Sequence, residues 1–325
     1  MELNKFDFEK CPWDQNTFSG RWNYYFWITN PMLCLKTDKE LEEAKALRFS
    51  YLSGTVPTGT TDEQLLAAKR IYESSFHPDT AQKQNVFGRM GFQVPGGMAI
   101  TGAMLSFYKT VPAIVFWQWI NQSFNALVNY TNRNANSPLS QNQMGVAYVS
   151  ATVAACITSI QFKQYLTRNT TPFFQRYVPF AAVAAANFVN IPLMRQNELL
   201  TGVDVFDADK NRVGCSKLAA AKGISQVILS RIVMCAPGMV LLPVIMEKLE
   251  SKSAWFKRST WIHAPFQTLA VGCFLVGMVP TACALFPQFC PIKLSTLEKY
   301  ENAAYCDIVN NCKNPPAVVY SNKGL

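Results

Sequence analysis

The chain has 325 residues, of which 49% are hydrophobic and 16% are charged, and its formal net charge is +9 at pH 7. A soluble protein carries about 25% charged residues, so this chain is poor in charge. Its Lys and Arg residues do not gather into a stripe and no recognition motif accompanies them, which argues against a nucleic acid as partner. Cations scattered among apolar segments are instead typical of the flanks of membrane helices.

Residues 1–96 are polar and rich in acids, and they predict a soluble N-terminal region with amphipathic helices. Two capping boxes lie in this region, Thr37-x-x-Glu40 and Thr61-x-x-Gln64. In a capping box the first and last side chains satisfy backbone amides at the start of a helix. Each box therefore predicts the first residue of a helix.

Five apolar stretches follow and predict a membrane domain over residues 97–287. A bilayer core is crossed by about 20 helical residues. We expect spans at about 97–117, 144–162, 178–194, 224–246 and 264–286. Several of these stretches are too long and too apolar on all sides for a soluble helical bundle. The sequence therefore predicts an all-α, polytopic membrane protein with about five transmembrane helices and a C-terminal tail over 288–325.

The first three expected spans contain no carboxylate. No Asp or Glu occurs between Asp79 and Glu198, although Lys and Arg occur along that stretch. Side chains of these spans therefore cannot form a proton relay or an acid–base pair. The resulting positive field favours an anion or the carboxylate end of a zwitterion. Avoidance of charge inside lipid explains part of this pattern, but it does not explain why the loops are free of acids as well.

A stripe of amide side chains begins at the end of the first expected span. Its members recur at steps of three or four residues: Gln118, Gln122, Asn125, Asn129 and Asn132. In a helix they would share one face. A carboxamide both donates and accepts hydrogen bonds, so this amide stripe could line the path of a polar zwitterion. Polar side chains also lock membrane helices together, and the sequence leaves both interpretations open.

Further polar groups lie in the third and fourth expected spans. Asn187, Asn190 and Arg195 surround Pro192, which frees a backbone carbonyl one turn earlier. Such a carbonyl and a guanidinium together suit an ammonium and a carboxylate, although a kinked helix end with a snorkelling Arg has the same pattern. Arg231 lies near the start of the fourth span, where a charge is costly unless it is paired or reaches water. It is a second candidate ligand, or an interfacial anchor if the span begins after it.

Catalytic and metal-binding motifs are absent from the sequence. It contains no GxSxG, Walker A, GxGxxG or HExxH motif, and its 10 Cys and 2 His do not follow zinc-ligand spacings. We therefore expect no enzyme, no metal site and no cofactor. The acidic N-terminal segment MELNKFDFEKC is neither a signal peptide nor an Arg-rich transit peptide.

Seven segments of the chain resemble the sideroflexin family. They are WDQNTFSGR (13–21), FHPDT (76–80), GRMGFQVPGGMAITG (88–102), FWQWINQSFNALVNYTNRNA (116–135), VPFAAVAAANFVNIPLMRQNEL (178–199), SRIVMCAPGM (230–239) and NKGL (322–325). The resemblance runs through nearly the whole chain and is closest to the animal branch associated with mitochondrial serine transport. The tail over 288–316 departs from the family pattern.

The resemblance implies a five-span protein of the mitochondrial inner membrane without a cleaved presequence. It also implies a carrier of serine, or of alanine or cysteine, that supports one-carbon metabolism. It assigns no substrate ligands, so the candidate site rests on the physical argument alone. The candidate substrate-binding residues are Arg231, Arg195, Asn187, Asn190, Asn125, Asn129 and Gln122.

Three other functions are compatible with parts of the pattern. A di- or tricarboxylate carrier would suit the basic, acid-free stretch equally well. A membrane scaffold for respiratory-complex assembly could use the amide stripe as a docking face. An iron carrier has poor support, because two His and no carboxylate in the first three spans leave few ligands for a hard cation.

Overall fold

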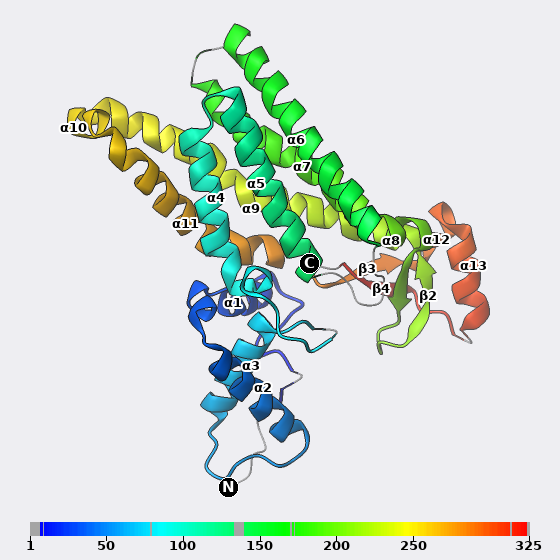
Figure 1. Ribbon diagram of the computed structural model, residues 1–325. Helices are drawn as coiled ribbons and strands as arrows, with labels where there is room; N and C mark the ends of the chain where they lie inside the picture. Colours follow the sequence, from blue (N-terminus) through cyan, green and yellow to red (C-terminus); the bar gives the residue numbers. More distant parts are fainter. Residues whose placement is uncertain are drawn as a thin grey trace. The chain divides into compact units, whose positions relative to one another are not determined.

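The structure is a computed structural model that describes residues 7–8, 10–78, 80–132, 140–169, 171, 173–312 and 314–323 (Figure 1). These residues form two compact units. Unit 1 is built from the described residues of Met1–Lys109, Ser123–Arg133 and Pro237–Ala284. Unit 2 is built from those of Thr110–Gln122, Asn134–Ala236 and Leu285–Leu325.

Unit 1 begins with three helices, α1 (Phe18–Ile28), α2 (Asp38–Leu52) and α3 (Asp62–Ser75). Both predicted capping boxes are present, because the hydroxyls of Thr37 and Thr61 accept bonds from backbone amides three residues later. The side chains of Glu40 and Gln64 accept bonds from the two cap amides in return. A bond from Lys36 and the cap amide together lower the pKa of Glu40 to about 2. The predicted starts of α2 and α3 are confirmed.

Helix α1 packs against the end of α11 (Thr260–Ala284). Tyr25 and Ile28 are buried in a cluster with Ala284. The buried Arg21 donates from Nε to the carbonyl of Ala284 at 2.9 Å. The last carbonyls of a helix have no partner within it, so the guanidinium serves as a cap for α11.

Among the residues that the structure describes, four helical segments have the length and apolar composition needed to cross a bilayer. They are α6 (Gln141–Asn169), the segment Phe174–Met194 that contains α7 (Val178–Met194), α9 (Lys217–Lys252) and α11. The expected spans at 144–162, 178–194 and 224–246 lie within the first three, and α11 covers the expected span at 264–286 except its last two residues. A short helix, α10 (Ala254–Arg258), connects α9 to α11.

The prediction of one continuous span at 97–117 is wrong. These residues belong to two helices, α4 (Gln93–Phe107) and α5 (Val111–Thr131). The hydroxyl of Thr110 accepts a bond at 3.4 Å from the first turn of α5, as a helix cap does. Pro112 has no N–H to bond to the preceding turn, so α4 cannot continue through it. Helix α5 has 21 residues, but it is not among these four, because its amide side chains interrupt its apolar stretch.

Unit 2 contains a sheet that the sequence did not predict. Its strands are β1 (Val203–Phe206), β2 (Arg212–Ser216), β3 (Phe289–Lys293) and β4 (Val318–Asn322), antiparallel in the order β2-β1-β4-β3. Helices α12 (Leu294–Tyr300) and α13 (Asn302–Asn311) lie beside it (Figure 1). The sheet, these helices and the start of α9 enclose a core of Val205, Val213, Ala219, Ile292, Leu297, Ile308 and Val319. The C-terminal tail therefore folds into unit 2.

The start of α9 is capped by a residue of that tail. The carboxylate of Glu301 accepts bonds from the backbone amides of Lys217 at 2.8 Å and Leu218 at 3.0 Å. It also accepts a bond from the hydroxyl of Ser216. A carboxylate at this position satisfies amides that have no partner in the helix and interacts favourably with the helix dipole.

Candidate functional site

The amide side chains of α5 differ in burial along the helix. Gln118 and Gln122 are 0% and 2% exposed, whereas Asn125 and Asn129 are half-buried. The boundary between the two units falls after Gln122. The two Gln residues therefore belong to unit 2, and the two Asn residues belong to unit 1.

The buried part of the amide stripe contacts α6 within unit 2. Gln118 donates from Nε2 to the hydroxyl of Ser159 at 3.4 Å, and Ser159 donates to the carbonyl of Ala155 at 2.6 Å. Gln122 Nε2 and Asn121 Nδ2 are buried and have no hydrogen-bond partner among the described residues. A buried polar group without a partner costs about 1–3 kcal/mol. Buried donors in proteins are nearly always hydrogen-bonded, so a polar ligand or an ordered water is needed to supply acceptors for these two amide groups.

The end of the stripe in unit 1 is bonded to its neighbours. Asn132 donates to the carbonyl of Gly88 at 3.2 Å and accepts from Gln84 Nε2 at 2.7 Å. Next to it, Asn85 Nδ2 donates to the hydroxyl of Thr131 at 3.1 Å. These bonds attach the end of α5 to residues 84–88. These bonds are of the kind that the helix-locking interpretation predicts.

Arg195 lies at the end of α7 and is bonded on two sides. Its Nε donates to Glu198 Oε2 at 3.0 Å, and its Nη1 donates to the carbonyl of Lys323 at 2.6 Å. The side chains of Arg195 and Glu198 are only 16% and 11% exposed. Glu198 belongs to α8 (Gln196–Thr201), which follows α7 directly. The charge of Arg195 is therefore balanced within the chain, a pairing that the sequence analysis did not consider.

Arg231 has a different environment from Arg195. It is half-buried in α9, and its side chain makes no hydrogen bond or ion pair with any residue that the structure describes. The hydroxyl of the adjacent Ser230 is buried and likewise has no partner in the described part of the chain. An Arg in a membrane helix is costly unless it is paired or reaches water. Arg231 is therefore a cation available to an anionic group of a ligand.

Helix α7 packs against the first part of α9 within unit 2. Ile191 packs in a buried cluster with Ile224 and Ile228 of α9, and the adjacent Asn190 is 6% exposed. Helix α7 ends and α9 begins on the side of the sheet (Figure 1). Asn187 lies one turn before Ile191 in α7, and Arg231 lies one turn after Ile228 in α9. Unit 2 thus brings these two candidate residues to the same level of neighbouring helices.

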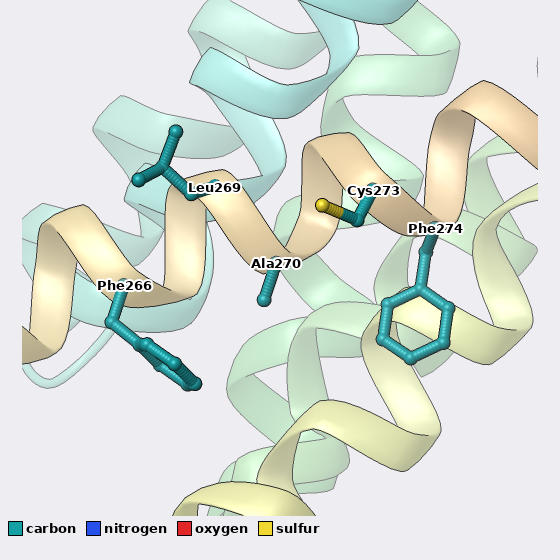
Figure 2. A pocket seen from close by; sticks show the side chains of 5 residues that line it. All are labelled: Phe266, Leu269, Ala270, Cys273 and Phe274. Carbon is teal, nitrogen blue, oxygen red and sulfur yellow. The ribbon is translucent and has the colours of Figure 1, made fainter.

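A hollow of unit 1 offers no such chemistry. It has a volume of about 540 Å³ and is lined by Phe266, Leu269, Ala270, Cys273 and Phe274. All five residues lie on α11, as Figure 2 shows. Such a lining has no charged or amide group, so it cannot match the two charges of an amino acid. We therefore place the candidate site among the polar groups of unit 2.

The structure also changes which residues are candidates for the site. Gln122, Asn187, Asn190 and Arg231 remain candidates within unit 2, and Arg195 belongs to that unit but is already paired. Asn125 and Asn129 belong to unit 1. The sequence analysis missed Ser159 and Asn121, and it did not pair Glu198 with Arg195. Only Glu198 had a signal in the sequence, because an Arg and a Glu three residues apart face each other on a helix.

Comparisons with known proteins agree with the resemblance found in the sequence. The model of the family "Sideroflexins" matches residues 7–325. Sideroflexin-2 of Drosophila melanogaster is 55% identical over 320 residues, which are 98% of each chain. Sideroflexin-2 of Bos taurus is 53% identical over 324 residues, which are 100% of this chain and 99% of the relative. Sideroflexin-1 of Homo sapiens is 50% identical over 313 residues, which are 96% of this chain and 95% of the relative.

No solved structure matches the chain significantly. The family match covers nearly the whole chain, and relatives of both kinds align from end to end. The chain therefore belongs to the sideroflexin family.

Proposed function

We propose that the protein carries serine or another small neutral amino acid across the mitochondrial inner membrane and so supports one-carbon metabolism. The observation that carries the proposal is the chemistry of unit 2. Its helices hold buried amide donors without partners and one half-buried Arg without an ion pair among the described residues. The mitochondrial location and the metabolic role rest on the resemblance to the family.

These groups suit a zwitterion. Arg231 would bind the carboxylate, because a guanidinium matches a carboxylate in charge and geometry. Pro192 lacks the N–H that would bond to the carbonyl of Phe188, so that carbonyl is an acceptor for the ammonium. Asn187 and Asn190 would donate to and accept from the polar groups of the ligand.

The charge balance favours an amino acid over a di- or tricarboxylate. Glu198 balances the charge of Arg195, whereas no carboxylate of the described residues pairs with Arg231. One available cation matches the single carboxylate of serine. A ligand with two or three carboxylates would leave at least one of them without a cation at this site, and burying an unpaired charge is prohibitive.

The proposal is tested with the purified full chain in liposomes. We expect saturable uptake of labelled serine that unlabelled alanine and cysteine reduce, and no uptake of labelled citrate above that of empty liposomes. Uptake of citrate in preference to serine would instead identify a carboxylate carrier. Uptake of neither, by protein that is folded and correctly inserted, would contradict a carrier and favour the scaffold.

Gln122→Leu should separate a ligand-binding role from a helix-locking role. Its Nε2 makes no bond with the described residues, so the substitution breaks no hydrogen bond of that donor and relieves the cost of burying it. We expect uptake of serine to fall about two- to tenfold, which corresponds to one hydrogen bond of about 0.5–1.5 kcal/mol. The melting temperature of the purified protein should stay the same or rise.

Asn132→Leu is the matched control for this variant, because Asn132 bonds to Gly88 and Gln84 at the other end of the stripe. It should lower the melting temperature, and uptake per folded molecule should not change. A Gln122→Leu variant that loses stability while its uptake per folded molecule stays normal would show that Gln122 only holds helices together.

A further inference from the structure

A second hollow lies in unit 2, between the start of α5 and the last turns of α6. Its volume is about 190 Å³, and Val111 and Ile160 form its apolar part. Its polar part is formed by four side chains of α6, namely Lys163, Gln164, Thr167 and Arg168. None of these residues is acidic and two are cations, so the hollow attracts an anion.

The position of α5 adds to this positive field. Val111 is the first residue of α5, and the amides of a first helical turn have no partners within the helix. They give the start of a helix a partial positive charge, which acts in the same direction as Lys163 and Arg168. Gln164 adds a neutral donor at the same hollow.

An exposed apolar stripe on α6 leads into the hollow. Val146, Val149, Val153 and Ile157 are 59%, 57%, 50% and 49% exposed. Their steps of three and four residues place them on one face of the helix, and the next positions on that face are Ile160 and Gln164. The stripe therefore ends at two residues that line the hollow.

The length of this stripe matches a lipid chain. Val146 and Ile160 are 14 residues apart in the chain. At about 1.5 Å per residue this is about 21 Å of helix. Half of a bilayer core is about 15 Å thick, so the stripe is long enough for the acyl chain of one leaflet.

Aromatic side chains place the hollow at the level of the headgroups. Tyr165 is 60% exposed and lies between two of the lining residues, and Phe174 is 47% exposed in the connection from α6 to α7. Exposed aromatic residues gather where the hydrocarbon core of a membrane meets its headgroups. The cations of the hollow then lie beside lipid phosphates.

We propose that this hollow is a binding site for an anionic phospholipid. The phosphate lies against Lys163 and Arg168, the glycerol contacts Val111 and Ile160, and one acyl chain follows the apolar stripe of α6. A soluble phosphate would use the cations but not the apolar wall or the stripe. Basic pockets between membrane helices are known to accept anionic headgroups in other proteins. The site is independent of the transported substrate.

The proposal is tested by native mass spectrometry of the full chain released from nanodiscs. The nanodiscs contain either phosphatidylcholine alone or phosphatidylcholine mixed with phosphatidylglycerol. We expect phosphatidylglycerol to stay bound in preference to phosphatidylcholine. In the double variant Lys163→Gln/Arg168→Gln the bound fraction of phosphatidylglycerol should fall at least about fivefold, since each cation near a lipid surface contributes about 1 kcal/mol.

Two further variants sharpen the test. Lys293→Gln removes one charge from an exposed position at the end of β3 and should leave lipid binding unchanged. Val153→Gln alters the stripe but not the cations, and it should also lower the bound fraction of phosphatidylglycerol. Unchanged lipid binding in Lys163→Gln/Arg168→Gln would overturn the proposal. Displacement of the lipid by an equal concentration of glycerol 3-phosphate would also overturn it, because the site would then recognise a soluble phosphate.

Discussion

Arg231→Gln should lower the initial rate of serine uptake at least about tenfold while leaving the yield of folded protein close to normal. Loss of a charge-assisted hydrogen bond to the substrate is worth about 1.5–3 kcal/mol, and about 1.4 kcal/mol is a factor of ten. The fold should tolerate the change, because Arg231 forms no bond with the described residues that would be lost. Initial rates in liposomes, compared at matched amounts of folded protein, measure the effect.

Two controls accompany this variant. Arg258→Gln makes the same chemical change at an exposed position of α10 and should leave the rate unchanged. Arg231→Lys keeps the charge without the planar guanidinium, so it should recover part of the lost rate. A near-normal rate for Arg231→Gln would remove Arg231 from the binding site.

Breaking the pair between Arg195 and Glu198 should have the largest effect on stability. Both side chains are mostly buried, so Glu198→Gln leaves the charge of Arg195 without its carboxylate. Removal of one partner from a buried pair costs about 3–5 kcal/mol. We expect Glu198→Gln and Arg195→Gln each to lower the free energy of unfolding by about this amount, measured by thermal unfolding of the purified protein in detergent.

The double variant Arg195→Gln/Glu198→Gln distinguishes the cause of this loss. It leaves no unpaired charge, so it should be more stable than either single variant. Asp204→Asn is a control in the same unit, because the side chains of its pair with Arg212 are 48% and 60% exposed. It should shift the unfolding temperature much less. A double variant no more stable than the single ones would show that the unpaired charge is not the cause.

Uptake by these variants tests the role first predicted for Arg195. If Arg195 binds the substrate carboxylate after separating from Glu198, Arg195→Gln should lower uptake per folded molecule about tenfold, as for Arg231→Gln. If the pair is only structural, uptake per folded molecule should stay close to normal in both single variants. The bonds of Arg195 to Glu198 and Lys323 lead us to expect the second result.

The elements that the sequence predicted well are those that neighbouring residues determine. The expected span at 178–194 coincides with α7, since Pro179 suits the first turn of a helix and an apolar run follows it. The capping boxes at Thr37 and Thr61 fixed the starts of α2 and α3 in the same way. Each of these signals lies within a few residues of the boundary that it marks.

The features that the sequence missed depend on residues far apart in the chain. Strand β1 has four residues and pairs with β4, which begins more than one hundred residues later, so no local pattern reveals the sheet. The bond between Gln118 and Ser159 joins two helices across 41 positions. The break at Thr110 was a local feature, but the apolar residues on both sides of it concealed the boundary. In the candidate site, Arg231 was predictable from its residue type, whereas the lack of partners around Gln122 required the structure.

The long-range contacts of unit 2 constrain the order in which the molecule can be made. The carbonyl of Lys323 completes the bonds of Arg195 and lies 128 positions after it. Strand β4 lies between β1 and β3, so β3 cannot join β1 and β2 in one sheet until residues 318–322 have been synthesised. All four apolar helices precede β4 in the chain. Unit 2 therefore closes only after its last strand has been synthesised, and until then the edges of β1 and β3 that pair with β4 stay uncovered.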